Sequence, residues 1–136
     1  MPRLYRQSPL NAIWEGSGNV IALDVLRALS REPDSLKAVQ AELKKPLGRH
    51  HAYDAHVSRL AEYLTPGNLH ESTARGFARD AALALQGAAL HEMAPDFVFE
   101  AFCAQRLASD RNGLLYGDVS PDVDQARLIE RAIPAV

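Results

Sequence analysis

One stretch near the amino terminus combines residue types that bind ligands and move protons. It reads Ile13-Trp14-Glu15-Gly16-Ser17-Gly18-Asn19-Val20. Its two glycines allow a backbone to approach a ligand closely, and Ser17 with the free N–H groups of a following helix can receive anionic or polar atoms. Glu15 follows an indole, and partial desolvation raises the pKa of a carboxyl group toward the range of a general base. The stretch is therefore a candidate ligand turn with one acid.

The same stretch is also compatible with an ordinary helix start. In that interpretation Ser17 or Asn19 caps the helix, the glycines only form a turn, and Glu15 is a solvated acid that the helix dipole favours. A glycine-rich turn on its own is a weak signal. The residues alone leave both interpretations open.

Two stretches of the chain resemble the acyl-CoA dehydrogenase family. The first runs from Arg3 to Val20, is similar to the C-terminal segment of the family, and continues through Leu23-Asp24-Val25-Leu26-Arg27-Ala28-Leu29. Within it, Trp-Glu-Gly-Ser-Gly-Asn-Val resembles the isovaleryl-CoA dehydrogenase-like branch that includes the AidB-like proteins. The second stretch, Ala101-Phe102-Cys103-Ala104-Gln105-Arg106-Leu107 followed by Tyr116-Gly117, is similar to the tail of that branch. The middle of the chain, about residues 33 to 64, carries little resemblance.

The resemblance implies roles for residues of the turn. Glu15 occupies the position of the family's base, which takes the α-proton of an acyl-CoA thioester while FAD accepts the β-hydride. Gly16, Ser17 and Asn19 occupy positions that lie against FAD, often across a subunit interface. The resemblance also implies an acyl-CoA substrate, an electron-transfer acceptor and a homo-oligomer.

The chain departs from the common family pattern at two positions of the turn. Ser17 replaces a threonine, and Gly18 is an additional glycine. Both departures suit the AidB-like branch, in which dehydrogenase activity is weak and a C-terminal extension is associated with duplex DNA. A DNA-associated domain and a purely structural assembly domain therefore stand as alternatives to an oxidoreductase.

Length and composition limit how many domains the chain can contain. With 136 residues, of which 47% are hydrophobic, the chain can form one domain with a real core. The N-terminal helical domain and the central β domain of the family do not fit into this length, so we expect the chain to be the C-terminal portion of a longer flavoprotein. Its partners are then the missing domains, and the chain alone is expected to be inactive, because a base without flavin and thioester has nothing to act on.

Other features of the sequence concern location and redox state. No apolar run reaches the ~20 residues of a membrane span, and the amino terminus lacks a signal-peptide pattern, so a cytoplasmic location is expected. The single cysteine, Cys103, cannot form an internal disulfide and is expected to be buried. Because the net charge is −2, any binding to nucleic acid requires a local basic patch.

Basic residues that could form such a patch gather in two places. Lys44, Lys45 and Arg49 crowd one junction, which is either a solvated loop or a phosphate-binding patch. Arg75 and Arg79 lie one helical turn apart and either pair with acids of their own helix or contact DNA. The candidate nucleic-acid contacts are Lys44, Lys45, Arg49, Arg75, Arg79, Arg106 and Arg111.

Histidines do not predict a metal site. Adjacent histidines such as His50 and His51 point in different directions on a helix, and neither cysteine nor carboxylate completes a ligand set with them and His56. We therefore expect no metal.

The hydrophobic pattern predicts an all-α, antiparallel bundle of five or six helices. Residues 20–136 are expected to form one domain, and residues 1–19 an arm. The helix over residues 20–29 is apolar on most sides, so it should be buried in the bundle, lie against missing domains or pair with another copy.

The remaining predicted helices are bounded by proline, glycine and capping residues. Residues 81–90 are small and apolar, which allows neighbouring helices to approach closely, so their helix should be the central one. The predicted segments run from Pro33 to Pro46, through Tyr53 to Leu64, from Leu69 to Met93 after an Asn68/Glu71 capping box, from Asp96 to about Ser109, and onward from Ser120-Pro121.

Overall fold

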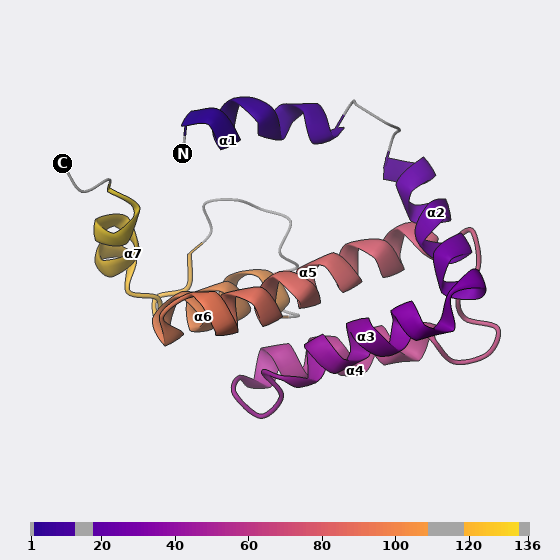
Figure 1. Cartoon of the computed structure of the whole chain (residues 1–136). Coiled ribbons are helices and arrows are strands. Elements are labelled where there is room, and N and C mark those ends of the chain that lie inside the picture. Colours follow the sequence, from indigo (N-terminus) through magenta and orange to yellow (C-terminus); the bar gives the residue numbers. More distant parts are fainter. Residues whose placement is uncertain (1, 13–17, 109–118, 134–136) are drawn as a thin grey trace.

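The structure is a computed structural model, and it describes residues 2–12, 18–108 and 119–133. The protein is an all-α helical bundle, and no strand occurs in these three ranges. The helices of the described ranges are α1 (Pro2–Gln7), the 3-10 helix η1 (Ser8–Ala12), α2 (Gly18–Arg31), α3 (Pro33–Lys44), α4 (His51–Tyr63), α5 (Ala74–Met93), α6 (Asp96–Phe102), the π-helix η2 (Cys103–Leu107) and α7 (Gln125–Ala132) (Figure 1).

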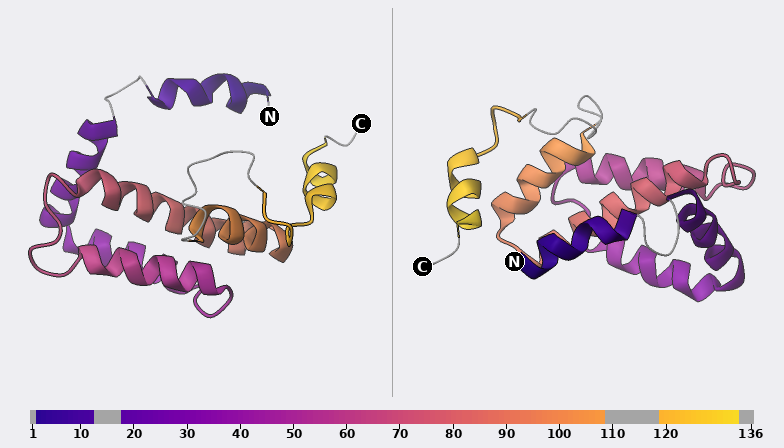
Figure 2. Two further views of the ribbon diagram at one scale, coloured as in Figure 1. Left: turned by 180° about the vertical axis from the view of Figure 1, so that it is seen from behind. Right: turned by 90° about the horizontal axis from the view of Figure 1, so that it is seen from above.

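Helix α5 is the central element, as its small apolar residues predict. It contacts α2, α3, α4 and α6, and the views in Figures 1 and 2 show these helices gathered along its length. Close packing on α5 depends on Gly87, where an added Cβ would lie only 2.8 Å from Cε2 of Tyr53. The ring of Tyr53 therefore lies directly against the α5 backbone.

Tyr53 also links α4 to α3 and α5 through hydrogen bonds of its hydroxyl. Its side chain is fully buried, and its hydroxyl lies 3.1 Å from the carbonyl oxygen of Leu43 and 3.3 Å from that of Ala84. The Leu43 carbonyl belongs to the last turn of α3, where helix carbonyls lack a partner within the helix. Burial raises the pKa of the Tyr53 phenol, so the hydroxyl stays protonated and remains a donor.

The core of the described residues consists of two groups of buried side chains, and Tyr53 belongs to the first. One joins α4 to α6 and η2, and the other joins α3, α4 and α5. Cys103 belongs to the first group and is fully buried, which confirms the expectation for this residue. Burial raises the pKa of its thiol to about 12, so it behaves as a small apolar side chain. The buried members are Ala52, Tyr53, Phe99, Cys103 and Leu107 in the first group, and Leu43, Leu60, Phe77 and Ala84 in the second.

The positions of prolines predicted several helix boundaries correctly. Pro33 is the first residue of α3, and Pro95 directly precedes α6. Proline is tolerated at a helix start because its missing N–H would have no partner there. Helix α3 ends at Lys44, just before Pro46, as predicted.

Two predicted helix starts are wrong. Helix α5 begins at Ala74 rather than Leu69, because the Thr73 hydroxyl binds the carbonyl oxygens of Asn68 and His70 and holds residues 68–73 in turns. Helix α7 begins at Gln125 rather than after Pro121, since Asp124 caps it by accepting from the Arg127 N–H at 3.0 Å. Among the described residues, the six α-helices from α2 to α7 agree with the five or six that were expected, and α1 lies within residues 1–19, the predicted arm.

Helix α2 is less buried than its composition predicts. Only Ala22 is buried, and Val20 and Ile21 remain 48% and 46% exposed. Every residue from Arg3 to Leu10 is exposed as well, and Figure 1 shows α1 standing away from the central helices. Within the described ranges, no helix has the length and apolar character that crossing a membrane requires.

Candidate functional site

The predicted ligand turn is described only at its carboxyl end. Glu15, Gly16 and Ser17 lie outside the described residues, so their predicted roles stay predictions. Gly18 and Asn19 are the first two residues of α2. The described part of the site is therefore the start of α2 and the residues that contact it.

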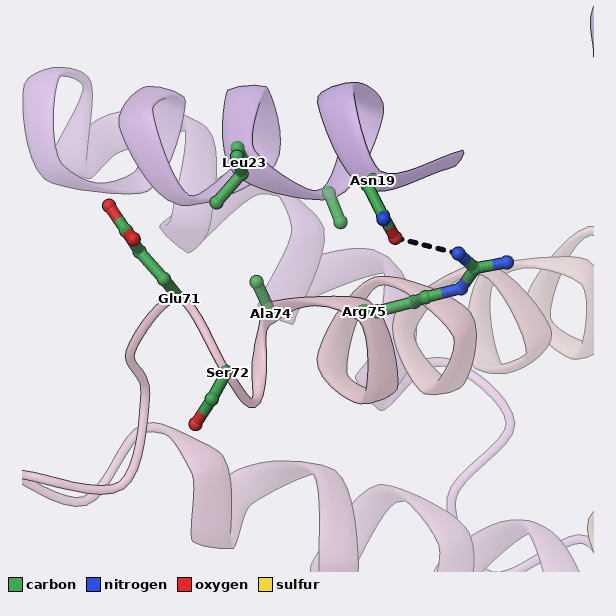
Figure 3. Close-up of a pocket in the computed structure, with 7 residues that line it drawn as sticks. Asn19, Leu23, Glu71, Ser72, Ala74 and Arg75 are labelled. Atoms are coloured by element: carbon green, nitrogen blue, oxygen red, sulfur yellow. Dashed lines mark hydrogen bonds between the residues drawn. The ribbon is translucent and has the colours of Figure 1, made fainter. Parts of the chain in front are cut away.

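Arg75 of α5 binds the side chain of Asn19. Its Nη1 donates to Asn19 Oδ1 at 2.6 Å, and Figure 3 shows the two side chains reaching toward each other from the first turns of α2 and α5. Gly18 lies close by, since a Cβ at that position would be 3.6 Å from Arg75 Nη2. The sequence instead predicted an ion pair of Arg75 with Glu71 or a contact to DNA, and Glu71 is not part of α5.

A shallow cavity of about 530 Å³ opens beside this contact. Its apolar side is formed by Ala22, Leu23 and Ala74, and its polar side includes Asn19 and Arg75. A guanidinium and a carboxamide can donate to phosphate, carbonyl or hydroxyl oxygens. Glu71 and Ser72 complete the polar lining, so the cavity holds one carboxylate together with these donors.

The other predicted basic contacts do not form one patch. Lys45 lies between Glu42 and Glu92, at 2.6 Å and 2.7 Å, and the hydrogen bonds to these two carboxylates raise its pKa. Arg49 pairs with Asp96 at 3.6 Å. This group lies at the carboxyl end of α5, roughly 25 Å along the helix from Arg75 at its start.

The remaining candidates differ in their surroundings. Arg79 pairs with its neighbour Asp80 at 2.8 Å, as the intrahelical alternative predicts, and the hydrogen bond to this carboxylate raises its pKa. Lys44 is exposed, and Arg106 is partly buried in η2. Arg111 lies outside the described residues. Several of the predicted phosphate contacts are thus already neutralised by acids of the same chain.

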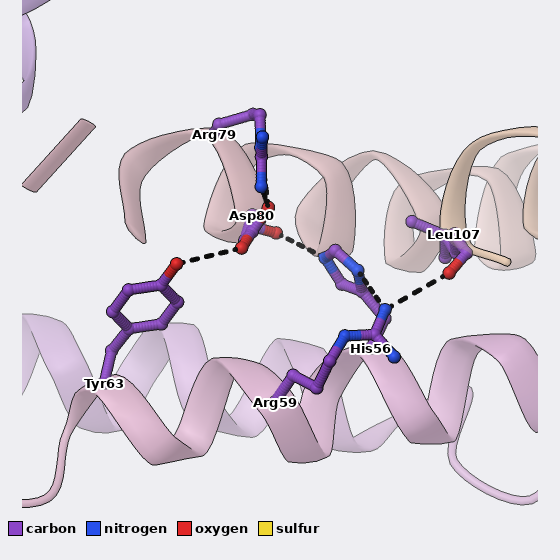
Figure 4. Close-up of polar contacts among 6 residues, drawn as sticks. All are labelled: His56, Arg59, Tyr63, Arg79, Asp80 and Leu107. Carbon is purple, nitrogen blue, oxygen red and sulfur yellow. Dashed lines mark hydrogen bonds and ion pairs between the residues drawn. The ribbon is translucent and has the colours of Figure 1, made fainter. Parts of the chain in front are cut away.

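The sequence did not predict a polar network around the buried His56 (Figure 4). The His56 Nε2 lies 2.9 Å from the carbonyl oxygen of Asp80, and its Nδ1 lies 3.4 Å from Arg59 Nη2. Because a carbonyl oxygen only accepts, Nε2 carries the proton and Nδ1 accepts from Arg59. Arg59 also donates to the carbonyl oxygen of Leu107, at 3.3 Å.

This network holds α4 against α5 and η2. The Tyr63 hydroxyl adds a bond of 3.4 Å to Asp80, and burial raises the pKa of this phenol. No local sequence signal could predict these contacts, because His56 and Asp80 are 24 positions apart. Within the described ranges, no group of three or more histidine, cysteine, aspartate or glutamate side chains is arranged to hold a metal ion.

Comparison with known proteins identifies one relative. The chain is 41% identical over 64 residues to the Escherichia coli (strain K12) protein named "Putative acyl-CoA dehydrogenase AidB". The aligned segment covers 47% of this chain and 12% of that protein. No family model matches the chain. The similarity supports a relation to acyl-CoA dehydrogenase-like proteins.

Proposed function

We propose that the chain is the C-terminal helical portion of an acyl-CoA dehydrogenase-like flavoprotein of the isovaleryl-CoA dehydrogenase-like and AidB-like branch. The observation that carries this proposal is the 41% identity over 64 residues with AidB. The resemblance of residues Trp14–Asn19 to the family motif is a second argument for the proposal. Since the aligned segment is 12% of the relative, the activity of a whole flavoprotein remains part of the proposal.

In this role Glu15 is the base that removes the α-proton of an acyl-CoA thioester. FAD, when bound, supplies the acceptor for the β-hydride. Gly16, Ser17 and Asn19 lie against the cofactor. Helix α5 supports the start of α2, because Arg75 binds Asn19. The chain by itself then has no turnover, because FAD and thioester need the domains that precede it.

Replacement of Glu15 tests the assignment in the whole flavoprotein. Glu15→Gln removes the base while keeping the size of the side chain, so acyl-CoA should no longer bleach the flavin although FAD stays bound. Glu130→Gln is a matched control, because Glu130 is an exposed acid on α7. Unchanged bleaching in Glu15→Gln would disprove the role of this residue.

A structural assembly role is the second candidate, and the exposed apolar residues of α2 favour it. Val20, Ile21 and Leu23 are 48%, 46% and 38% exposed in the first turns of this helix. Deleting the chain from the flavoprotein would then abolish assembly first and chemistry only indirectly. An assembly that forms normally without the chain would exclude this role.

Association with duplex DNA has less support from the described residues. Lys45, Arg49 and Arg79 are each within 4 Å of a carboxylate, which lowers the number of counterions that they could release from DNA. Fluorescence anisotropy with a labelled duplex across a salt series tests it. Strong binding at low salt that weakens steeply with added salt would favour the DNA-associated role.

A further inference from the structure

A second cavity, of about 520 Å³, lies between α4 and α5. Its walls belong to the second half of α4, the second turn of α5 and the turns that connect them. With the exception of Gly67, every residue that lines this polar cavity carries a polar or charged side chain. Cavities of about 300–1,000 Å³ commonly hold small molecules, and most of them are lined by apolar groups. A polar lining instead favours a small, hydrophilic ligand.

Arg79 and Asp80 neutralise each other on one wall of the polar cavity. Arg79 Nε donates to Asp80 Oδ1 at 2.8 Å, and the Tyr63 hydroxyl donates to Asp80 Oδ2 at 3.4 Å (Figure 4). The Asp80 side chain is only 15% exposed. This pair therefore supplies hydrogen-bonding groups without a net charge.

Arg59 brings an uncompensated positive charge to the polar cavity. Its Nη2 donates to the carbonyl oxygen of Leu107 at 3.3 Å and lies 3.4 Å from His56 Nδ1, and both of these acceptors are neutral. Among the described residues, no carboxylate lies within 4 Å of this guanidinium. The two neutral contacts hold the side chain in place, while its Nε and Nη1 bind no other described residue. A guanidinium held in this way can bind a carboxylate through two parallel hydrogen bonds.

Glu62 presents the opposite charge to the same cavity. It is exposed and lies three positions after Arg59 on α4. In the part of the chain that the structure describes, its carboxylate pairs with no cation. Its main chain is held in place, because the Glu62 carbonyl oxygen accepts from Asn68 Nδ2 at 2.9 Å. The polar cavity thus combines one cation and one carboxylate that no other group of the described residues neutralises.

We propose that the polar cavity binds a small zwitterion of the α-amino acid class. The ligand carboxylate binds the Arg59 guanidinium, and the ligand ammonium group binds the Glu62 carboxylate. Hydrogen bonds between charged groups are the stronger ones, and a zwitterion satisfies both unpaired charges at once. The site is independent of the proposed flavin chemistry, because all of its residues lie in α4, α5 and the turns between them.

Amide NMR spectra of the chain test this site with three matched probes. Alanine carries both charges, propionate lacks the ammonium group, and ethylamine lacks the carboxylate. Alanine should shift the amide signals of residues that line the cavity, among them Gly67 and Asn68, until the shifts saturate. Propionate and ethylamine should each bind roughly tenfold or more weakly, since each loses one charged contact. The absence of saturable shifts with alanine would overturn the proposal.

Two variants assign the two charges of the ligand to their partners. Glu62→Gln should weaken alanine binding roughly tenfold and leave propionate binding no weaker, whereas Arg59→Met should weaken the binding of both. Glu130→Gln changes an exposed acid of α7, so this matched control should bind alanine as the wild type does.

The Glu62 variant keeps the proposal falsifiable even if Arg59→Met does not fold. Arg59 also bonds to Leu107, whereas the Glu62 side chain has no partner among the described residues to lose. Equal affinity of alanine for Glu62→Gln and the wild type would overturn the proposal. Tighter binding of inorganic phosphate than of alanine at the same amides would also overturn it, because the cavity would then be a site for anions.

Discussion

At the scale of single residues, the contact between Gly87 and Tyr53 fixes how closely α4 approaches α5. The Tyr53 ring cannot withdraw easily, because it is fully buried and its hydroxyl donates to main-chain carbonyls of two helices. A side chain at position 87 would meet ring carbons at 2.8 Å and 3.0 Å. The glycine is therefore a packing requirement in the middle of a helix, where glycine is otherwise unfavourable.

We predict that Gly87→Ala destabilises the bundle. Overpacking costs about 1–3 kcal/mol, and the better helix propensity of alanine returns only about 1 kcal/mol. Urea denaturation should therefore show a net loss of up to roughly 2 kcal/mol. The control Gln86→Ala changes the exposed neighbouring residue and should stay within about 0.5 kcal/mol of wild type. A stabilised Gly87→Ala variant would contradict the packing described here.

Residue contacts over long sequence separations were the least predictable part of the site. The pattern placed Arg75 and Arg79 on a helix, and within the chain it offered partners only on the same helix, because helix periodicity relates residues three or four positions apart. That was correct for Arg79, which pairs with Asp80, and wrong for Arg75, which reaches Asn19. Such a partner depends on how α2 crosses α5, which no local pattern encodes.

At the scale of elements, the start of α4 depends on an unusual cap. His50 occupies the N-cap position, and its Nδ1 accepts from the Ala52 N–H at 3.1 Å. Its ring also stacks on His51, with centroids 4.8 Å apart. Burial, followed by the charge of His51, lowers the pKa of His50, while Glu100 and Asp54 oppose this shift. A protonated Nδ1 cannot accept a hydrogen bond, so acid weakens the cap.

We predict that His50 makes the stability of the bundle depend on pH in mildly acidic solution. Because the folded state lowers the pKa, the unfolded chain binds more protons in the window below 6.5, the ordinary value. The stability that the His50 cap contributes is complete above pH 6.5 and is lost as the pH falls through the lowered pKa. His50→Asn keeps a capping acceptor that does not titrate, so its urea midpoint should fall less between about pH 7 and pH 5. Equal pH dependence of the two proteins would refute the role of this cap.

Helix boundaries were predictable where a proline determines them. They were not predictable where a side chain caps the backbone. Pro33 and Pro95 mark helix starts as expected. The capping box of Asn68 and Glu71 did not form, since Thr73 binds the preceding carbonyl groups instead. A histidine cap such as His50 has no sequence signature, because histidine is not among the preferred capping residues.

At the scale of the whole molecule, the chain exposes more surface than a compact protein of its size. Its accessible area is 9,804 Å², whereas a folded monomer of 14.9 kDa exposes about 7,000 Å². Exposed apolar residues on α1, η1 and α2 contribute to this area, among them Leu4, Tyr5, Leu10, Val20 and Ile21. Exposed apolar side chains that lie together in this way are what an interface covers.

We therefore predict that the chain self-associates through α2. Sedimentation velocity across a range of concentrations should show dimers or larger species, and Ile21→Glu should shift them toward monomer. Met93→Glu serves as the control, because Met93 is also exposed but lies at the end of α5. A strictly monomeric chain at all concentrations would contradict pairing through this helix.

The measurement that tests the proposed function most directly is an anaerobic titration of the whole flavoprotein, reconstituted with FAD. Short, branched and long acyl-CoA thioesters are added in turn while the flavin absorbance is followed. The proposal predicts bleaching by one class of thioester, and this bleaching should disappear in Glu15→Gln. If no thioester reduces the flavin, the dehydrogenase proposal is wrong, and binding of duplex DNA across a salt series becomes the deciding experiment for the AidB-like alternative.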